Sequence, residues 1–594
     1  MMRVPLRPLA RVIAARSQGL DPDLAEAERR AAVLRNRRSE ERRRAEWRLW
    51  LLCAVFVMGF SAVGGKMALI AATDPEEPVR EIAGDPIRAH RADIVDRNGV
   101  LLATNMVTNA IYVETRQMVD KAGVAQGLAA IFPDLSAETL LEKFERPGNF
   151  HWIRSEISPE QQQAVFDLGQ PGVYFGPRET RVYPQGQRAG HILGGSRYER
   201  EGARAAELEG VAGIEYQYDD RLGDPAQVNT PLQLSIDMRV QNAVRDVLAA
   251  QMENFTAIGA AAIVMDAQNG EVVAMVSLPD FDPNDRPAPR GPQGDLLFSR
   301  ASQGVYELGS TFKAFAAANA MERGVAGPGT IIDTRGPLTW GRFRIRDFHN
   351  YGPELSLTEV MVQSSNIGSA RIALETGTLA QQDFLRELGF FDASPVELPE
   401  ARSARPLLPP RWSELSTMTI SYGHGLAATP LHLASAYASI VNGGLRVRPT
   451  LLAGAPAPTE EDRVVSRETS QALNQMLRAV VSRGTASYAD IEGYQVGGKT
   501  GTADKPVAGG YADDKVIATF AGMFPASDPR YVVVVSLDEP ETFAAGMIRR
   551  TAGWMAAPTM GMLVTRIAPI LGMRPTPEVI VADQGTTTLA RVAQ

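Results

Sequence analysis

Lysine is scarce in this chain, and two of its lysines stand beside hydroxyl residues. Only seven of the 61 basic residues are Lys. Because Lys can lose its proton when buried whereas Arg stays charged, a retained Lys marks a position where the amine itself is wanted. Lys313 ends the run Ser310-Thr311-Phe312-Lys313, and Lys499 begins the run Lys499-Thr500-Gly501-Thr502. Between them lies Ser364-Ser365-Asn366, so three polar segments form the candidate chemical centre.

Ser310 and Lys313 are a candidate nucleophile and base. Three residues apart on a helix, they would share one face about one turn apart. An Ala-rich stretch follows, which places Ser310 at the N-terminus of a helix, where free N–H groups favour developing negative charge. A buried Lys with a lowered pKa can take the serine proton and make the hydroxyl nucleophilic. The spacing alone is weak, because most such pairs are a capping Ser and a solvated Lys.

Ser364 and Asn366 are candidates for moving a proton and for positioning. A hydroxyl near the Ser310–Lys313 pair could relay a proton to a leaving amine. The Asn366 amide could hold Lys313 and a substrate carbonyl. The tripeptide by itself is equally typical of a polar turn that precedes a helix.

The segment from Lys499 to Thr502 follows Gly497-Gly498 and reads as part of a strand with glycines. Glycine in a strand permits close approach of a ligand backbone, and an edge strand can bind an extended peptide by backbone pairing. The N–H groups of Thr502 and Ser310 could form an oxyanion hole. Lys499 and the hydroxyls of Thr500 and Thr502, on either side of Gly501, suit a substrate carboxylate.

The N-terminal region predicts a membrane anchor. Residues 1–48 carry 13 Arg and seven acids, a balance of +6, and Leu49–Gly65 is then free of charge. These 17 residues lie at the short end of what spans a bilayer, and Met67–Ile70 could add length if Lys66 reaches the interface. Acids follow at 74–81, so the N-terminus is expected in the cytoplasm with the bulk exported. A cleaved signal peptide is the alternative, but the charged region is too long for one. The charged stretch at 26–46 is expected to be a charged tail that only sets topology, with a solvated helix as the alternative.

The rest of the chain predicts an α+β protein of more than one domain. A hairpin is expected around Asn98-Gly99, helices at Val124–Ile131, Glu160–Leu168 and Val240–Met252, strands at Ala260–Met265, Glu271–Val276, Lys515–Phe524 and Tyr531–Leu537, and a helical segment at Thr551–Ile570 with a break near Pro558. Longer elements begin near Leu232. The expected domains are a tail at 1–48, an anchor at 49–72, a scaffold at 73–231, a chemical domain at 232–572 and a tail at 573–594.

Composition excludes several classes of function. A net charge of −8 argues against nucleic-acid binding. The six histidines have no metal-ligand spacing, and the single Cys53 permits no disulfide, so neither a metal site nor a disulfide framework is expected. No cofactor is needed, since nucleophile, base and oxyanion donors would all come from the chain.

Taken in order, Ser-x-x-Lys, Ser-x-Asn and Lys-Thr-Gly resemble the signature of penicillin-recognising acyl-serine enzymes. From the anchor to about residue 572 the chain resembles a class B penicillin-binding protein, a peptidoglycan D,D-transpeptidase. Further segments carry the resemblance: Arg91, Asp96-Arg97-Asn98-Gly99, Arg181-Val182-Tyr183-Pro184, Gly213-Ile214-Glu215, Ser235-Ile236-Asp237, Pro279-Asp280-Phe281-Asp282-Pro283-Asn284, Tyr422-Gly423-His424-Gly425, Thr429-Pro430 and Asn442-Gly443-Gly444. Asn366 at the third position of its motif resembles the division-specific, FtsI-type branch; elongation enzymes usually have Asp there.

The resemblance implies a fold, an activity and partners. The fold would be a transpeptidase domain with a central antiparallel sheet and helices, preceded by a mixed α/β pedestal and one transmembrane helix. Ser310 would attack donor stem peptides at D-Ala-D-Ala, with Lys313 as base, Ser364 as proton shuttle and Asn366 as positioning residue. Lys499, Thr500 and Thr502 would hold the donor carboxylate, and an acceptor amine would form the septal cross-link. β-Lactams would acylate Ser310, and a polymerase of lipid-linked precursor and other divisome proteins would be partners.

Three departures from the family pattern and several rival functions stay open. Leu308, Ala92 and Asp504 stand where relatives commonly have Pro, Gly and Gln, which leaves acceptor preference and drug sensitivity undecided. A serine β-lactamase and a D,D-carboxypeptidase share the three motifs. The sequence is also compatible with an elongation-type transpeptidase, with a membrane-anchored β-lactam sensor, and with a divisome scaffold that has no essential catalysis.

Overall fold

A computed structural model describes residues 13–14, 16–19, 21–72, 91–198, 208–507 and 510–576 of the chain. The chain divides into two compact units, residues 1–86 and 87–594, and each is described by itself. The acidic residues expected after the anchor and most of the C-terminal tail, 577–594, lie outside the described residues.

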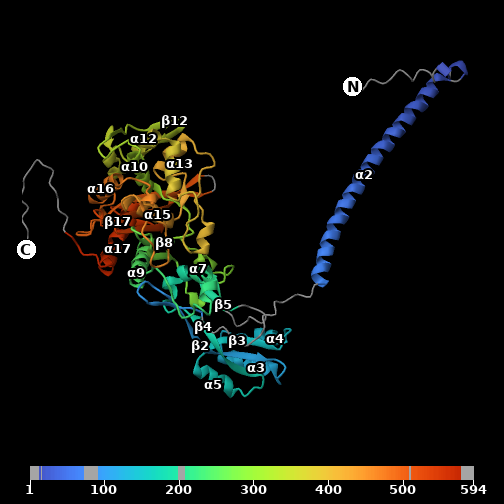
Figure 1. Cartoon of the computed structure of the whole chain (residues 1–594), viewed down its shortest axis with the longest axis horizontal. Coiled ribbons are helices and arrows are strands. Elements are labelled where there is room, and N and C mark those ends of the chain that lie inside the picture. The colour runs from blue at the N-terminus through green and yellow to red at the C-terminus, as the bar shows by residue number, and fades with distance from the viewer. Residues whose placement is uncertain are drawn as a thin grey trace, which may run out of the picture. The chain divides into compact units, whose positions relative to one another are not determined.

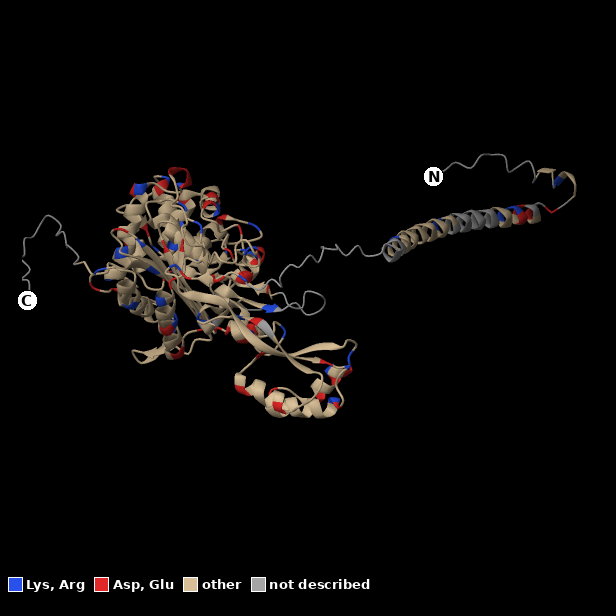
Figure 2. Ribbon diagram, turned by 60° about the horizontal axis from the view of Figure 1, so that its bottom comes forward, with Lys and Arg blue, Asp and Glu red and all other residues tan. Residues whose placement is uncertain are grey.

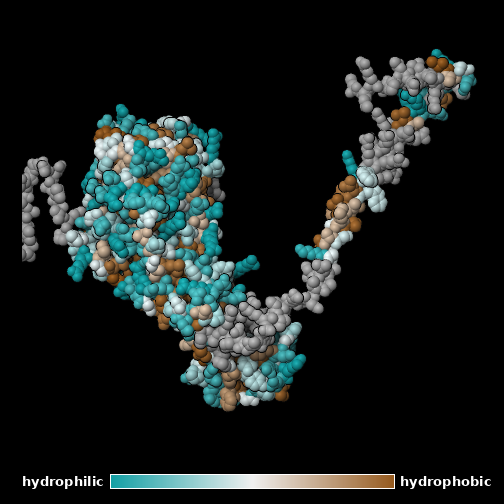
Figure 3. All heavy atoms as spheres, viewed as in Figure 1, coloured by the Kyte–Doolittle hydropathy of each residue, from teal (hydrophilic) through white to brown (hydrophobic). Residues whose placement is uncertain are grey.

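The first unit is dominated by one long helix, α2 (Pro22–Ala72). Its Trp47–Met67 stretch is 21 residues long and apolar enough to cross a membrane, and Figure 3 shows it as a brown band. At about 1.5 Å per residue, this stretch matches a hydrocarbon core of about 30 Å. The large apolar side chains of this stretch, among them Phe60, are exposed in the isolated chain, as expected for a surface that lipid would cover. The same helix continues through residues 26–46, so the alternative of a helix in this charged stretch is confirmed.

The second unit begins with a five-stranded sheet. Its strands run in the order β3-β2-β1-β7, and β4 also pairs with β2. These strands are β1 (Ile94–Val95), β2 (Leu101–Glu114), β3 (Phe150–Ile157), β4 (Val173–Val182) and β7 (Leu232–Gln233). Three helices bury a small apolar core against it, α3 (Lys121–Ile131), α4 (Ala137–Glu145) and α5 (Pro159–Asp167). Side chains cap all three, as when Asp120 accepts from Gly123 N. Figure 1 shows these helices together at one end of the unit.

A buried ionic cluster joins distant segments of the scaffold. The Glu215 carboxylate is fully buried and accepts from Arg91 Nε at 2.6 Å and from Arg181 Nε at 2.7 Å. Arg91 also bonds Asp219 at 2.7 Å, and Arg181 bonds Asn105 at 3.1 Å. Two guanidinium groups therefore depend on one carboxylate that water does not reach.

We expect Glu215→Gln to destabilise the protein strongly. The amide removes the negative charge between two buried cations, and breaking a buried pair in this way costs about 3–5 kcal/mol. Urea unfolding of the purified protein measures the loss. The matched control is Glu253→Gln, whose exposed carboxylate should contribute within about 0.5 kcal/mol. Equal stability of the two variants would contradict the role given to the cluster.

The larger part of the unit is built on a second sheet of five antiparallel strands. Its order is β16-β17-β18-β8-β9, so β16 lies at an edge. The strands are β8 (Gly259–Asp266), β9 (Val272–Leu278), β16 (Gly497–Val507), β17 (Gly510–Phe524) and β18 (Tyr531–Asp538). Every residue of β8, β9 and β18 is buried, because helices cover both faces of the sheet.

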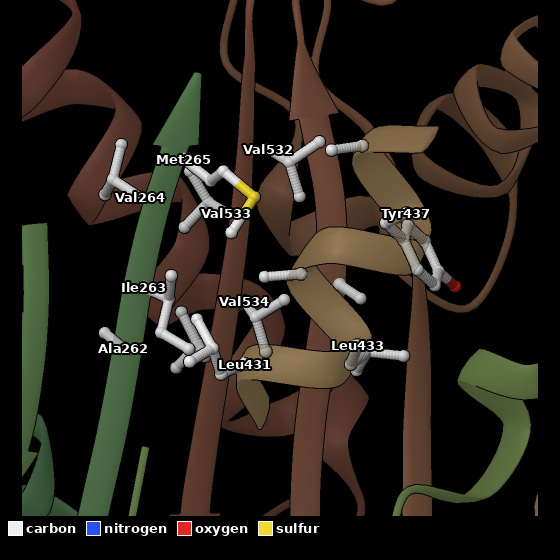
Figure 4. Close-up of a cluster of buried hydrophobic side chains, with 14 of the residues drawn as sticks. Ala262, Ile263, Val264, Met265, Leu431, Leu433, Tyr437, Val532, Val533 and Val534 are labelled. Atoms are coloured by element: carbon white, nitrogen blue, oxygen red, sulfur yellow. The ribbon is translucent and has the colours of Figure 1, made fainter. Parts of the chain in front are cut away.

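Helices α9 (Met238–Asn254) and α17 (Ala556–Ile570) pack together on one face of this sheet. Helix α15 (Pro430–Val441) covers the other face, and all twelve of its residues are buried. Figure 4 shows Leu431 of α15 beside Ile263 of β8 and Val534 of β18. This buried apolar layer contacts the segment that carries the candidate site, since Tyr437 of α15 donates to Thr311 O.

The remaining helices and strands surround these layers; Figure 2 shows the same ribbon from a second direction, with its charged residues coloured. The α-helices are α6 (Gly190–Leu193), α7 (Gly213–Gln217), α8 (Asp219–Leu222), α10 (Lys313–Glu322), α11 (Leu357–Gln363), α12 (Asn366–Thr376), α13 (Thr378–Glu387), α14 (Glu414–Ser421) and α16 (Arg467–Arg483). The short strands are β5 (Gly195–Tyr198), β6 (Leu208–Ala212), β10 (Tyr306–Glu307), β11 (Ile331–Asp333), β12 (Leu338–Trp340), β13 (Phe343–Ile345), β14 (Glu354–Ser356), β15 (Ala427–Ala428), β19 (Thr542–Ala544) and β20 (Met547–Arg549). The 3₁₀ helices are η1 (Gly186–Ala189), η2 (Pro283–Asp285), η3 (Gly294–Leu297), η4 (Gly309–Phe312), η5 (Pro399–Ser403), η6 (Glu460–Asp462), η7 (Ser487–Ala489) and η8 (Ala552–Trp554).

Most elements expected from sequence are present, with shifted ends. The hairpin at Asn98-Gly99 joins β1 and β2, and the expected helices and strands correspond to α3, α5, α9, β8, β9, β17 and β18. The break expected near Pro558 lies at Met555, between η8 and α17, so Pro558 itself is in the first turn of α17. Proline is tolerated there because first-turn N–H groups have no acceptor within the helix.

Candidate active site

Ser310 lies in the tight turn that leads into a buried helix. The turn η4 passes directly into α10, so the serine precedes the helix as the sequence predicted. Phe312 is buried and its ring contacts those of Phe315 and Phe390 at centroid distances of 5.0 to 5.3 Å. The Tyr437 hydroxyl of α15 donates to Thr311 O at 2.7 Å. These contacts fix the backbone on which the Ser310 hydroxyl is mounted.

The Lys313 amine lies at the centre of the site and is almost inaccessible to water, with 1% of the residue exposed. Its Nζ lies 2.8 Å from Ser310 Oγ and 3.0 Å from Ser364 Oγ. It also donates to Ser364 O and to Asn366 Oδ1, both at 2.7 Å. The Asn366 amide is oriented by its Nδ2, which donates to Arg346 O at 3.1 Å.

The same contacts suit a neutral amine. Ser364 O and Asn366 Oδ1 can only accept, so they take up two N–H groups, which is all that a neutral amine has. The lone pair is then left for a hydroxyl hydrogen, and Ser310 Oγ is within reach of it. Burial, together with the charge of Lys499, holds the pKa of Lys313 well below its usual value; Asp347 opposes this shift. The geometry and the lowered pKa therefore allow the amine to be neutral.

Ser364 places its hydroxyl between the two lysines. It ends α11 in the left-handed conformation, with φ of 62° and ψ of 43°. Such a conformation is uncommon for a residue with a side chain and costs of order 1 kcal/mol or more. Ser365 then caps α12 by accepting from Gly368 N at 2.9 Å. The two helices meeting at this point hold Ser364 Oγ 3.0 Å from both Lys313 Nζ and Lys499 Nζ.

Lys499 lies in the strand β16, as the sequence predicted, and it is fully buried. Its amine donates to Ser364 Oγ and to Thr500 O, at 3.0 and 3.1 Å. Burial lowers the pKa of Lys499 to about 7. Its amine therefore contacts the same hydroxyl, Ser364 Oγ, that Lys313 contacts.

Two glycines bring the edge strand against the serine turn. A Cβ on Gly501 would lie 2.2 Å from Leu308 O, and a Cβ on Gly309, where φ is +55°, would lie 2.6 Å from Thr502 O. This backbone approach brings Thr502 N beside the Ser310 turn, where a pair of amides can serve one oxyanion. Thr502 Oγ1 accepts from Ala552 N at 3.0 Å, and Thr500 Oγ1 lies 3.0 Å from Thr485 Oγ1. Both hydroxyls are thereby oriented.

Sequence reasoning missed Asp347, which ties the middle segment together. Its Oδ1 accepts from the N–H groups of Asn366, at 2.5 Å, and Ile367, at 3.0 Å. Its Oδ2 accepts from Ser365 Oγ at 2.7 Å. A carboxylate at the start of α12 complements the free N–H groups there. No spacing rule could have found it, since it lies 18 residues before Ser365 and reaches the site only through the fold.

The structure thus brings together all eight sequence-predicted site residues: Ser310, Lys313, Ser364, Asn366, Lys499, Thr500, Gly501 and Thr502. Their chemical roles stay predictions. Among the described residues, no group of three or more His, Cys, Asp or Glu side chains could hold a metal ion.

A buried lysine beside a hydroxyl nucleophile, and an edge strand within reach, define the class of serine acyltransferases that recognise D-Ala-D-Ala and penicillin. Residues 260–559 match the penicillin-binding protein transpeptidase domain, and residues 86–227 match the penicillin-binding protein dimerisation domain. The chain belongs to the class B penicillin-binding proteins, and it is of the FtsI-type peptidoglycan D,D-transpeptidases.

Individual relatives agree with this assignment. The chain is 37% identical over 506 residues to a probable peptidoglycan D,D-transpeptidase FtsI of Caulobacter vibrioides, with 83% of each chain covered. It is 28% identical to the peptidoglycan D,D-transpeptidase FtsI of Escherichia coli K12, over 91% of this chain and 94% of that one. A crystal structure of penicillin-binding protein 3 from Mycobacterium tuberculosis, complexed with aztreonam, is similar with a TM-score of 0.63 and 27% identity, covering 82% of this chain and 98% of that one. The predicted family, fold class and enzyme class are confirmed.

Proposed function

We propose that this protein cross-links septal peptidoglycan by an acyl-serine mechanism in which Lys313 is the base. Lys313 Nζ takes the proton of Ser310 Oγ as the oxygen attacks the carbonyl carbon between the two terminal D-Ala residues of a donor stem. The amides of Ser310 and Thr502 stabilise the negative charge of the tetrahedral oxygen. The single observation that carries the proposal is the 2.8 Å contact between Lys313 Nζ and Ser310 Oγ at a buried amine.

Collapse of the tetrahedral species breaks the C–N bond and forms the ester with Ser310. The leaving D-Ala amine takes a proton that passes from Lys313 through the Ser364 hydroxyl, which lies 3.0 Å from the lysine amine. The amine of an acceptor stem then attacks the ester carbonyl and gives a proton to Lys313. The lysine returns this proton to Ser310 Oγ as the ester C–O bond breaks, which restores the free serine. The product is one new amide between two stems, so no oxidant, metal or cofactor enters the balance.

The carboxylate of the donor is held at the strand β16 in this proposal. The hydroxyls of Thr500 and Thr502 bind it, and the buried Lys499 supplies positive charge behind them. β-Lactams acylate Ser310 by the same first step, since their strained amide takes the place of the D-Ala-D-Ala bond. In this proposal the adduct is long-lived because water does not hydrolyse the Ser310 ester in place of the acceptor amine.

We expect a bell-shaped pH dependence for acylation of Ser310 by benzylpenicillin. Below the lowered pKa of Lys313 the base is protonated, so the rate rises with pH through that pKa. Above a pH of about 7 Lys499 loses its charge, so the rate falls. The second-order rate constant, measured over a pH range from about 5 to about 10, reports these groups in the free enzyme.

The variant Lys499→Met separates the two limbs of this profile. The falling limb should disappear, and the rising limb should move to higher pH because a cation near Lys313 is gone. A profile with unchanged limbs would contradict the roles given to the two lysines.

The experiment that tests the function is cross-linking by the purified full-length protein in the presence of a peptidoglycan polymerase and lipid-linked precursor. Dimeric stems and free D-Ala should appear with the wild type and not with Ser310→Ala. Release of D-Ala without dimers would instead indicate a carboxypeptidase, and rapid turnover of penicillin a β-lactamase. Partner assembly without any acyl-enzyme would favour a sensor or a scaffold.

Localisation and domain limits are part of the same proposal. The Arg-rich residues 1–48 would lie in the cytoplasm, 49–72 in the membrane, and 73–231 and 232–572 outside it as pedestal and transpeptidase domains, with a tail at 573–594. The excess of Arg before the apolar part of α2 supports this orientation. Divisome partners and a polymerase would bind the anchor and the pedestal.

A further inference from the structure

A cavity of about 530 Å³ opens directly beside the candidate active site. It is lined by residues 334–337, by the loop 346–353 and by Ile367 of α12. The backbone of Arg346 accepts from Asn366, and Asp347 accepts from the backbone of both Asn366 and Ile367. The cavity therefore lies next to Asn366, the residue whose side chain binds the Lys313 amine.

The acidic groups of this cavity are already satisfied. Both Asp347 oxygens accept hydrogen bonds from the start of α12. Asp333, whose strand β11 leads into the lining, binds Arg335 at 2.9 and 3.1 Å and Arg371 at 3.2 Å. These pairs leave no free carboxylate on the lining loop among the described residues.

Arg346 is the open cation of the cavity. Its guanidinium makes no hydrogen bond or ion pair with any described residue, although Arg346 is part of the lining. Two more arginines, Arg342 and Arg344, lie on the adjoining hairpin of β12 and β13. Arg presents a planar fork of donors that matches a carboxylate, so the cavity has the charge for an anionic ligand.

The loop also offers flat apolar surface next to this charge. Phe348 is 80% exposed, and its ring meets that of His349 at 4.8 Å, which in turn meets Tyr351 at 6.0 Å. A ligand that lies along these rings and ends at Arg346 would have both an apolar body and a negative group. A peptide with an acidic residue has both an apolar part for the rings and a carboxylate for Arg346. A neutral sugar has no negative group for Arg346 to bind.

We propose that this cavity binds a carboxylate of the donor stem peptide, upstream of the bond that Ser310 attacks, with Arg346 as its cation. The inference rests on the proposed function, in which the acyl part of the donor stays on Ser310. Ser310 Oγ contacts Lys313 Nζ, which donates to Asn366 Oδ1, and Asn366 Nδ2 donates to Arg346 O. An extended acyl chain gains about 3.3 Å per residue, so a side chain a few residues before the attacked bond can reach the neighbouring cavity. Arg346 would thus select donors by charge before the acyl transfer takes place.

Two synthetic donors test the proposal with the purified full-length protein. They are D-Ala-D-Ala pentapeptides that differ only in one upstream group, a free carboxylate in one and its carboxamide in the other. The kcat/KM for D-Ala release should favour the carboxylate about tenfold, in keeping with a charge-assisted hydrogen bond. In Arg346→Gln this ratio should fall to about one. In the matched control Arg402→Gln, which replaces an arginine bonded to Gln217 of the scaffold, the ratio should stay at the wild-type value.

The possible results distinguish the carboxylate site at Arg346 from the acyl transfer to Ser310 on which it rests. A ratio near one in the wild type, or a ratio that Arg346→Gln leaves unchanged, overturns the carboxylate site, while release of D-Ala still upholds acyl transfer to Ser310. If neither donor releases D-Ala and benzylpenicillin does not label Ser310, both the site and the proposed function are overturned.

Discussion

Acylation of Ser310 by benzylpenicillin should slow by about 10³- to 10⁴-fold in Lys313→Met, towards the upper end of what a positioned base contributes. Methionine fills the buried volume but offers no lone pair to the serine proton. The carbonyl of Ser364 and the amide oxygen of Asn366 also lose their donor at 2.7 Å, so the site loses its central connection. The second-order rate constant of acylation, followed by intact-protein mass, measures the effect.

Lys515→Met is the control for this prediction. Lys515 is 49% exposed in its side chain and pairs with Glu539 on the surface of the same sheet, at 3.2 Å. This variant removes the same kind of amine without touching the relay, so its acylation rate should equal that of the wild type. An acylation rate for Lys313→Met within tenfold of the wild type would show that another group takes the serine proton.

Gly501→Ala should lower the same rate by about 10²- to 10³-fold, comparable to the loss of an oxyanion donor. The new Cβ would lie 2.2 Å from Leu308 O and 2.9 Å from Thr311 Cγ2, and the first of these is backbone that cannot turn aside. The strand β16 must then move away from the Ser310 turn, and Thr502 N moves with it. The effect is on geometry, because the backbone at Gly501 has no positive φ.

Gly329→Ala provides the comparison, since its Cβ meets nothing within 4 Å. Both variants are measured for acylation and for the midpoint of thermal unfolding, at a temperature where both are folded. We expect the acylation rate of Gly501→Ala to fall while the protein stays folded. A folded Gly501→Ala protein with the wild-type rate would mean that Thr502 N is not an oxyanion donor.

The residues of the candidate site could be predicted because each motif is short in sequence. Ser310 and Lys313 belong to one turn, and Lys499 and Thr502 to one strand, so local spacing places each pair close together. The scarcity of Lys also indicated that the amine groups of Lys313 and Lys499 are needed for chemistry. The burial that lowers the pKa of Lys313 could only be expected, because it comes from α12 and β16, which are distant in sequence.

The parts that could not be predicted depend on contacts between remote segments. Asp347 reaches Asn366 because the loop after β13 folds over the start of α12. The left-handed conformation of Ser364 leaves no mark in its sequence, since Ser does not favour it as Gly does. The strand at Lys499 was predicted, but the burial of its amine was not, because that burial depends on pairing of Lys499 with Ala521 and on Ser364, which are distant in sequence.

The most direct test of the central claim is the intact mass of the full-length protein after incubation with benzylpenicillin, followed for hours beside Ser310→Ala. We predict one adduct on the wild type, persisting for hours, and none on the variant. An adduct on Ser310→Ala, or no adduct on either protein, would contradict the assignment of Ser310 as nucleophile. An adduct on the wild type that is lost within minutes would contradict a transpeptidase and indicate a hydrolase.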